Sequence, residues 1–143
     1  MPDAFRYQRR VEFCDTDAAG IAHFSAFFQY MEQAEHALLR HVGTSVVVED
    51  QEGTISWPRA SASCDYTGSV RFEDIIEVVV RIDRLGSKSV TYTFDFEKGD
   101  DIVARGKMTA VCCRIVHDAP PKSIAIPSWL IEQLRTFETP STP

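Results

Sequence analysis

The clearest pattern of apolar positions predicts a long helix over residues 25–42. Apolar side chains recur there at spacings of three and four residues, which is the period of one face of an α-helix. The stripe consists of Phe24, Phe27, Phe28, Met31, Ala34, Leu38 and Val42. Much of the remaining surface is polar, and Gly43 follows where helices commonly end. A second, shorter helix is predicted over residues 127–137, because Pro127 suits a helix start.

Most of the remaining chain alternates between apolar and polar residues, which is typical of half-buried strands. The predicted strands cover residues 5–13, 55–66, 76–83, 90–97 and 102–116. Turns are predicted around Gly86 and at residues 98–101. The last strand carries mostly small residues on one face, which would let a helix approach the sheet closely. These are Ala104, Gly106, Met108, Ala110 and Cys112.

The order of these elements predicts an α+β fold. A strand and the long helix come first, and four strands and the short helix follow. One long helix can bury its apolar stripe only against the sheet, so the antiparallel sheet must curl around it. The length of 143 residues fits a single domain over residues 1–138. Residues 139–143 are predicted to form a disordered tail.

Composition narrows the classes of function. Hydrophobic residues make up 44% of the chain and charged residues 25%, as in ordinary globular proteins. The net charge of −6 argues against a general nucleic-acid binder, which needs a basic surface. Residues 1–10 contain no apolar segment typical of a signal peptide, and no apolar run is long enough to cross a membrane. We therefore expect a cytoplasmic protein that binds neither nucleic acid nor membranes.

Several kinds of site are excluded by motif. The cysteines form no C-x-x-C pair and have no histidine at zinc-ligand spacing, so we expect reduced, mostly buried thiols and no metal site. These cysteines are Cys14, Cys64, Cys112 and Cys113. The chain lacks the G-x-S-x-G motif of α/β-hydrolases and the G-x-x-x-x-G-K loop that binds nucleotide phosphates.

The candidate chemistry lies between the first strand and the long helix, in residues 13–24. Asp15 and Asp17 precede Gly20 and His23 in this stretch. A carboxylate beside the N-terminus of a helix faces backbone N–H groups that can stabilise a developing oxyanion. That combination suits attack on an activated acyl group.

This stretch resembles the signature of the 4-hydroxybenzoyl-CoA thioesterase family of hotdog-fold proteins. In that signature a strand leads to Asp-x-Asp-x-x-Gly, an aromatic residue or histidine, and the central helix. Asp15, Asp17, Gly20, His23 and Phe24 fall in register with it. The resemblance implies a hotdog fold and an acyl-CoA thioesterase that releases a free acid and coenzyme A. It implies no cofactor, because coenzyme A is part of the substrate. It also implies a homodimer or homotetramer with active sites at the subunit boundary.

By this resemblance, Asp17 is the catalytic carboxylate. It either attacks the carbonyl to give a mixed anhydride or activates a water molecule. Asp15 is the better candidate for holding the loop or tuning Asp17. The backbone N–H groups of His23 and Phe24 are the expected oxyanion donors, because they come where the helix begins. The His23 ring either contacts the water or thioester or is structural. Gly20 is expected to allow a backbone conformation or a close approach that a side chain would block.

The acyl group is expected to contact two further residues. Glu32 matches an acid that contacts the polar end of the acyl group, and a solvated or dimer-facing side chain is the alternative. Trp57 is expected to line the acyl pocket, with core or interface packing as the alternative. The bulk of its indole disfavours hydroxybenzoyl itself and leaves short, branched or aliphatic acyl groups as candidates.

Coenzyme A is expected to bind at the turn that contains Ser87 and Lys88. Their hydroxyl and ammonium groups suit its phosphates, and Arg59 and Arg71 are candidate helpers. Two other functions stay open at this point. One is hydrolysis of an acyl group carried on the phosphopantetheine arm of a carrier protein. The other is binding of acyl-CoA without turnover. The identity of the acyl group and the assembly beyond a dimer are also open.

Overall fold

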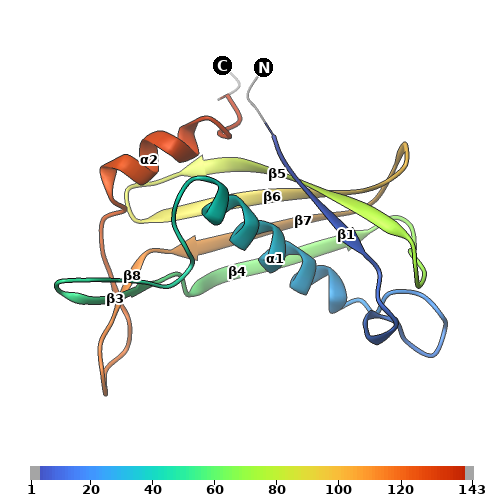
Figure 1. Cartoon of the computed structure of the whole chain (residues 1–143), viewed down its shortest axis with the longest axis horizontal. Coiled ribbons are helices and arrows are strands. Elements are labelled where there is room, and N and C mark those ends of the chain that lie inside the picture. Colours follow the sequence, from blue (N-terminus) through green and yellow to red (C-terminus); the bar gives the residue numbers. More distant parts are fainter. Residues whose placement is uncertain (1–3, 141–143) are drawn as a thin grey trace.

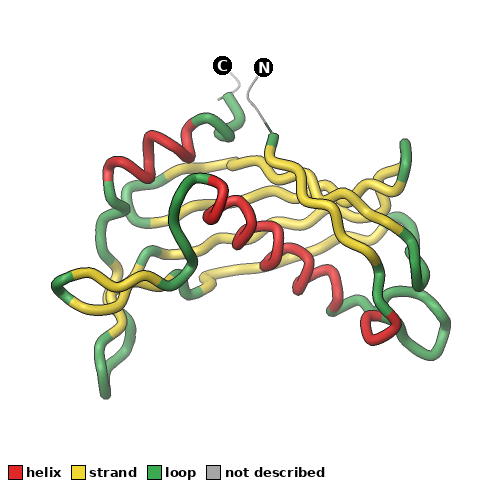
Figure 2. The backbone as a smooth tube through the Cα atoms, in the orientation of Figure 1, coloured by secondary structure: helices red, strands yellow, loops and turns green. Residues whose placement is uncertain are grey.

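One long helix packs across a five-stranded antiparallel sheet that curls around it (Figure 1). The computed structural model describes residues 4–140. The helix, α1 (Ala26–His41), forms where the apolar period predicts it and buries one face against the sheet. Figure 2 shows the strands of the main sheet gathered into one layer, with α1 lying obliquely across it. The predicted α+β hotdog architecture is therefore confirmed.

The main sheet has the strand order β1-β5-β6-β7-β4, and each neighbouring pair is antiparallel. Its strands are β1 (Phe5–Arg10), β4 (Arg59–Tyr66), β5 (Ile75–Leu85), β6 (Ser89–Lys98) and β7 (Asp101–Val111). The β6–β7 connection is the predicted hairpin turn, with Gly99 at φ +59°. The second helix, α2 (Ser128–Arg135), lies within its predicted range and packs against β5.

The core lies between α1 and the concave face of the sheet. Its side chains are the alternating apolar residues of the strands and the inner stripe of α1. Gly106 on β7 faces Met31 on α1 so closely that a Cβ atom at Gly106 would overlap the Met31 side chain. The small residues of β7 therefore let the helix approach the sheet, as the sequence predicts.

Three predicted strands differ from the observed ones. The first strand ends at Arg10, because residues 13–15 form a short 3₁₀ helix, η1 (Phe13–Asp15). The predicted strand over residues 55–66 is interrupted at Trp57–Pro58, and the predicted strand over residues 102–116 is interrupted at Cys112. Proline has no N–H to donate to a strand ladder, which accounts for the first of these two breaks.

Both interrupted strands continue into a small second sheet that the sequence analysis missed. Its order is β2-β3-β8-β9. The strands are β2 (Val48–Asp50), β3 (Gly53–Ser56), β8 (Cys113–Ile115) and β9 (Lys122–Ser123). The β3–β8 pairing extends the β4–β7 pairing beyond the bend, so this sheet projects from one end of the molecule (Figure 1).

β4 forms one border of the main sheet, and within residues 4–140 it pairs only with β7. Its side chains are mostly small and exposed, among them Ala60, Ser61, Ala62 and Ser63. The opposite border, β1, carries Arg6, Arg9 and Arg10 instead. Charges discourage pairing at a sheet edge, so β4 is the border better suited to association.

The C-terminal tail and the cysteines concern two further expectations. Thr139 donates a backbone hydrogen bond to Ile82 O at 2.7 Å, and the disorder of residues 139–143 stays a prediction. Residues 141–143 of the predicted tail lie outside the described residues. All cysteines are free thiols, but only Cys112 and Cys113 are buried, whereas Cys14 is exposed. Among residues 4–140, no helix is long and apolar enough to cross a membrane.

Candidate active site

The loop between β1 and α1 is fixed by backbone hydrogen bonds. Asp17 N–H donates to Ile21 O at 2.9 Å, and an isolated bridge joins Thr16 to Ala22. Ala22 N–H also donates to Val70 O at 2.8 Å, which ties the loop to the segment before β5. The loop that carries the aspartate motif is therefore attached to the body of the protein on both sides.

Asp15 is the buried member of the aspartate pair, with 6% of its surface exposed. Its Oδ2 atom accepts hydrogen bonds from Tyr30 Oη and Glu12 N, both at 2.9 Å, and lies 3.4 Å from Arg9 Nη2. Burial and the Asp15 carboxylate together raise the pKa of Tyr30, so its hydroxyl remains a donor. These contacts agree with the expectation that Asp15 holds the loop.

Asp17 lies in a tight turn in which only one of its two carboxylate oxygens accepts a hydrogen bond from the described residues. Oδ1 accepts a hydrogen bond from Ala19 N at 2.8 Å, and Gly20 N donates to Asp17 O at 2.9 Å. Gly20 has φ +79°, a conformation that favours glycine, which agrees with its predicted role in the backbone. Oδ2 of Asp17 accepts no hydrogen bond from residues 4–140. This oxygen is therefore available to a substrate.

Asp17 borders a small cavity of about 180 Å³ at the N-terminal end of α1. The other lining residues are Ile21, Ala22, Phe24, Phe27, Tyr66, Gly68 and Ser69. The hydroxyl of Tyr66 donates to Phe24 O at 2.8 Å and joins the end of β4 to the start of the helix. The cavity thus combines an apolar wall with one carboxylate, as small-molecule sites combine apolar linings with a few polar groups.

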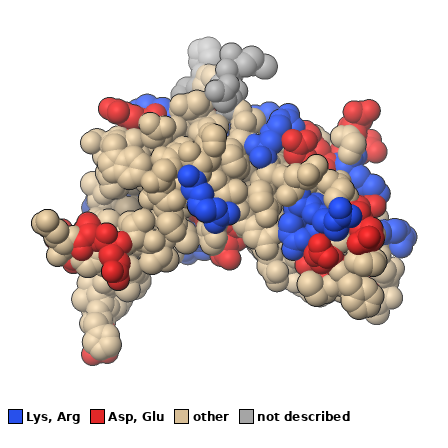
Figure 3. Space-filling view, viewed as in Figure 1, with Lys and Arg blue, Asp and Glu red and all other residues tan. Residues whose placement is uncertain are grey.

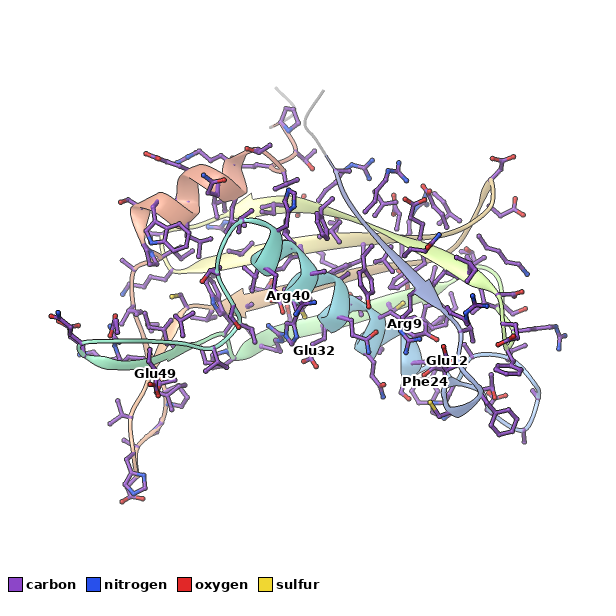
Figure 4. All side chains as sticks on the ribbon, in the orientation of Figure 1. Arg9, Glu12, Phe24, Glu32, Arg40 and Glu49 are labelled. Carbon is purple, nitrogen blue, oxygen red and sulfur yellow. The ribbon has the colours of Figure 1, made fainter. Side chains whose placement is uncertain are left out.

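The two expected oxyanion donors differ in availability. His23 N–H donates to Asp15 O at 2.7 Å, so this N–H is already used inside the protein. Phe24 N–H donates no hydrogen bond to residues 4–140, and Figure 4 shows Phe24 at the start of α1. Of the two expected donors, the Phe24 amide is therefore the one that makes no hydrogen bond within the described residues, and the role of either amide as an oxyanion donor stays a prediction.

The His23 ring packs on Phe24, with ring centroids 4.5 Å apart. Ser25 N donates to its Nδ1 at 3.2 Å, and Ser25 Oγ lies 2.7 Å from the same atom. Since Nδ1 accepts, the neutral ring carries its proton on Nε2. The exposed ring therefore has one N–H that can donate to a bound molecule.

The predicted acyl-binding residues do not meet Asp17 within one protomer. Glu32 lies near the middle of α1 with an exposed side chain (Figure 4). Trp57 is 5% exposed and belongs to the core, so the alternative of core packing describes it within the protomer. Arg59 at the start of β4 donates hydrogen bonds to Trp57 O at 3.1 Å and to the Glu35 carboxylate. Most of the N–H donors on its guanidinium therefore already have partners inside the protein.

Ser87 and Lys88 are exposed in the β5–β6 turn. Their carbonyls accept hydrogen bonds from Ile126 N and Cys112 N, which attaches this turn to the segments beside the small sheet. In Figure 1 the turn lies beside α2, at the opposite end of the sheet from the loop that precedes α1. One protomer therefore does not bring the predicted phosphate-binding turn to Asp17. Arg71 lies nearer, since its Nη1 is 3.5 Å from Gly20 O.

Glu35 is a polar residue of α1 that the sequence analysis missed. It is fully buried and accepts two hydrogen bonds from Arg59, Nη2 to Oε1 at 2.6 Å and Nη1 to Oε2 at 2.8 Å. Burial raises the pKa of Glu35, although the Arg59 hydrogen bonds and charge act in the opposite direction. The signal was its position four residues after Met31 and three before Leu38, inside the apolar stripe. A carboxylate at such a position requires a buried partner.

Charged side chains gather unevenly on the face that carries α1. Figure 3 shows acidic and basic groups mixed at the end where β1 meets the loop, and a mainly acidic group at the opposite end, where the small sheet projects. The basic residues there include Arg9 and Arg71, and the acidic residues include Glu12 and Glu73. The surroundings of the cavity are therefore of mixed sign rather than strongly basic.

Known proteins resemble this chain in both sequence and structure. A protein of Aquifex aeolicus that is named as a proposed esterase is 30% identical over 131 residues, covering 92% of this chain and 98% of that protein. A 1,4-dihydroxy-2-naphthoyl-CoA hydrolase of Thermosynechococcus vestitus is 27% identical, covering 87% and 86%. The solved structure of a gentisyl-coenzyme A thioesterase has a TM-score of 0.78 and 26% identity, covering 90% of this chain and 98% of that one.

The family model for the thioesterase superfamily matches residues 19–105, more than half of the chain. The matched range includes Gly20, Phe24, Glu32 and Arg59, and it begins just after Asp17. It also spans α1 and the strands β4, β5 and β6 of the main sheet, together with the start of β7, whereas β1 lies before it. By this match and by its fold, the chain belongs to the thioesterase superfamily.

Proposed function

We propose that this protein hydrolyses acyl-CoA thioesters to a free acid and coenzyme A, with Asp17 as nucleophile or general base. The observation that carries the proposal is the free Oδ2 of Asp17 at an apolar cavity, beside the free amide of Phe24 at the start of a helix. The names of the relatives support the substrate class, because two of them act on acyl-CoA thioesters.

In the nucleophilic route, Oδ2 of Asp17 attacks the thioester carbonyl carbon and the C–S bond breaks. Coenzyme A leaves as a thiolate and takes a proton from water, while Asp17 and the acyl group form a mixed anhydride. A water molecule then cleaves the anhydride, which regenerates the carboxylate and releases the acid. In the general-base route, Asp17 takes a proton from the attacking water, and the departing thiolate receives it. In both routes the Phe24 amide donates to the carbonyl oxygen as it becomes negative.

We further propose that the working unit is a dimer formed through β4. Antiparallel pairing of β4 with its copy about a twofold axis would set the Arg59 end of one protomer against the Tyr66 end of the other. Tyr66 lines the cavity at Asp17, so the second copy would supply Glu32 and Arg59 to that cavity. This arrangement offers a reason why one protomer does not unite the predicted residues.

The test is thiol release from a panel of acyl-CoA substrates, with Asp17→Asn as the decisive variant. An asparagine still accepts the hydrogen bond from Ala19 N, so the turn should survive. We expect a loss on the order of 10²-fold or more in kcat. Asp100→Asn, at the exposed β6–β7 turn, is the matched control and should retain activity. Activity of Asp17→Asn within a factor of a few of the wild type, with both folded, would remove Asp17 from the mechanism.

Two further measurements separate the alternatives. A single turnover in isotopically labelled water can transfer label into Asp17 only by the nucleophilic route, because only that route forms an anhydride whose Asp17 carbonyl water can attack. Comparing the same acyl group on coenzyme A and on a carrier protein identifies the preferred carrier through kcat/KM. Binding of acyl-CoA without turnover of any panel member would instead favour a non-catalytic acyl-CoA-binding protein.

A further inference from the structure

The Glu35–Arg59 pair joins α1 to the start of β4, away from the cavity at Asp17. Both oxygens of Glu35 accept N–H groups of one guanidinium, at 2.6 and 2.8 Å. This is the two-pronged arrangement of an ionised carboxylate, since a protonated carboxyl would place its own donor in one of these positions. The positive charge of Arg59 is therefore balanced by a carboxylate that no solvent reaches.

The exposed part of this cluster is acidic. The Glu32 side chain is 57% exposed, whereas that of Arg59 is 26% exposed and its Nη2 lies 3.5 Å from Glu32 Oε2. His36 Nε2 lies 3.6 Å from Glu35, but burial lowers the pKa of His36 and favours its neutral form. Arg40, further along α1, carries a positive charge near His36 but forms no ion pair with Glu32 or Glu35 within residues 4–140. The groups that contact one another are therefore two carboxylates and one guanidinium, which leave a net charge of one negative unit. Glu32 presents that charge to the outside.

β4 relates this cluster to the candidate active site. Arg59 at its start contacts α1 near the middle of the helix, and Tyr66 at its end contacts Phe24 at the helix N-terminus. β4 therefore runs alongside α1 in the opposite direction, with the acidic cluster at one end and the cavity at the other. The twofold pairing of β4 in the proposed dimer would set the acidic cluster of one copy at the distal end of the other copy's cavity. The inference below rests on that part of the proposed function.

We propose that Glu35 is a positioning residue that determines which acyl ends the enzyme accepts. By neutralising Arg59, it leaves Glu32 as the uncompensated charge at the distal end of the acyl site. Acyl groups that end in a hydroxyl donor are accepted there, and uncharged ends are tolerated. Acyl groups that end in a carboxylate are rejected, because they meet a like charge and Arg59 is occupied.

The test compares acyl-CoA thioesters of equal chain length that end in methyl, hydroxyl or carboxylate. In the wild type, kcat/KM should be lowest for the carboxylate-ended thioester. Glu35→Gln keeps the size of the side chain but leaves Arg59 uncompensated. The ratio of kcat/KM for the carboxylate-ended over the methyl-ended thioester should then rise about tenfold, mainly through KM, because charge-assisted guanidinium–carboxylate bonds are strong. A purely structural role for Glu35 would lower both values together.

Glu35→Gln/Arg59→Met is the matched control, because it removes the released positive charge. Its ratio should return to the wild-type level. The inference is overturned if the control keeps the gain, or if a folded Glu35→Gln has the wild-type ratio. It is also overturned, whatever the variants do, if the wild type handles the carboxylate-ended thioester as well as the methyl-ended one.

Failure of the proposed function gives a different result. In that case the wild type hydrolyses none of the thioesters, and calorimetric titration with non-hydrolysable thioether analogues of the same three end groups replaces turnover. Weaker binding of the carboxylate-ended analogue, relieved by Glu35→Gln, would still support the role of Glu35. Equal binding of all three analogues by the wild type would overturn it.

Discussion

The hydroxyl of Tyr30 donates a hydrogen bond of 2.9 Å to Oδ2 of Asp15, and this contact joins the central helix to the loop that carries Asp17. Both residues are buried. Asp15 in turn accepts the N–H of Glu12 and lies beside Arg9, so one carboxylate connects β1, the loop and α1. The position of the candidate catalytic residue therefore depends on a neighbour that does not line the cavity.

Tyr30→Phe should loosen this connection. It removes one donor from a buried carboxylate, and we expect the free energy of unfolding to fall by about 1–3 kcal/mol. Thioesterase activity should fall several-fold as the loop becomes less well positioned. Tyr7→Phe is the control, since the Tyr7 hydroxyl makes no hydrogen bond within residues 4–140. Chemical denaturation of the two variants gives the comparison, and equal stability would contradict a supporting role for Tyr30.

Gly106→Ala tests the close packing of α1 on the sheet. A methyl group at this position would overlap the Met31 side chain, and both residues are buried. Such overpacking should cost about 1–3 kcal/mol of stability. The cost should shrink when Met31 is first changed to alanine, because the space it occupies is then free. A double-mutant cycle by thermal or urea unfolding measures this coupling, and strictly additive effects would mean that the two residues do not interact.

Trp57→Ala distinguishes packing from substrate contact. The indole is 5% exposed among core residues, so its removal should cost about 3–5 kcal/mol. Trp129→Ala on α2 is the matched control, because that indole is 48% exposed and its loss should change stability by less than about 0.5 kcal/mol. A series of acyl chain lengths completes the test. If Trp57→Ala prefers larger acyl groups than the wild type does, without a large loss of stability, Trp57 lines the acyl pocket.

The sequence predicted the elements whose patterns are local and repeated. The period of α1, the alternation of β6 and the small residues of β7 each reflect one buried face, so they were visible without the structure. The breaks at Trp57–Pro58 and Cys112 depend on how the sheet bends and where its strands find partners. Pro58 was a local signal for one of them, whereas Cys112 offered none.

The candidate site shows the same division between local and distant contacts. Asp17, Gly20 and Phe24 lie within one loop, so their order along the chain was enough to group them. The Glu35–Arg59 pair joins a helix to a strand across 24 residues. The sequence showed a carboxylate in an apolar stripe but not which basic residue would meet it. Asp17 and Glu32 lie apart in one protomer, and in the proposed dimer they would meet only across the two copies.

Asp74→Asn should make stability less dependent on pH. The Asp74 carboxylate accepts the N–H of Arg71 at 2.8 Å and lies 2.9 Å from Lys98 Nζ, and these contacts hold the pKa of Asp74 below its ordinary value of 3.8. A lowered pKa in the folded state contributes stability above the unfolded value, and that stability is lost as the pH falls through the folded value. The side chain is partly exposed, so screening limits the expected loss at neutral pH to about 0.5–1 kcal/mol.

The difference in the free energy of unfolding between the wild type and Asp74→Asn should therefore narrow as the pH falls below about 4. Urea unfolding at a series of pH values measures it. Asp100→Asn provides the comparison, since Asp100 makes no ion pair within residues 4–140. If the difference in the free energy of unfolding stays constant down to low pH, the charge of Asp74 does not contribute to stability through Arg71 and Lys98.

The proposed dimer depends on the open edge of β4, and Ala62→Lys should disrupt it. Ala62 is exposed near the middle of the strand, so twofold pairing would bring it close to its own copy. Two lysines there would repel each other and occupy space that only small side chains fit. Light scattering across a dilution series should give the wild type a mass of at least twice 16.1 kDa, and Ala62→Lys a smaller one. Thioesterase activity should fall with the mass, because each cavity would lose the Glu32 and Arg59 side chains of its neighbour.

Gln133→Lys adds the same charge on the exposed face of α2, away from β4, and should leave mass and activity unchanged. A wild type that is a stable, fully active monomer would contradict the shared site, and the residues that bind the acyl end would then have to be sought around the cavity at Asp17.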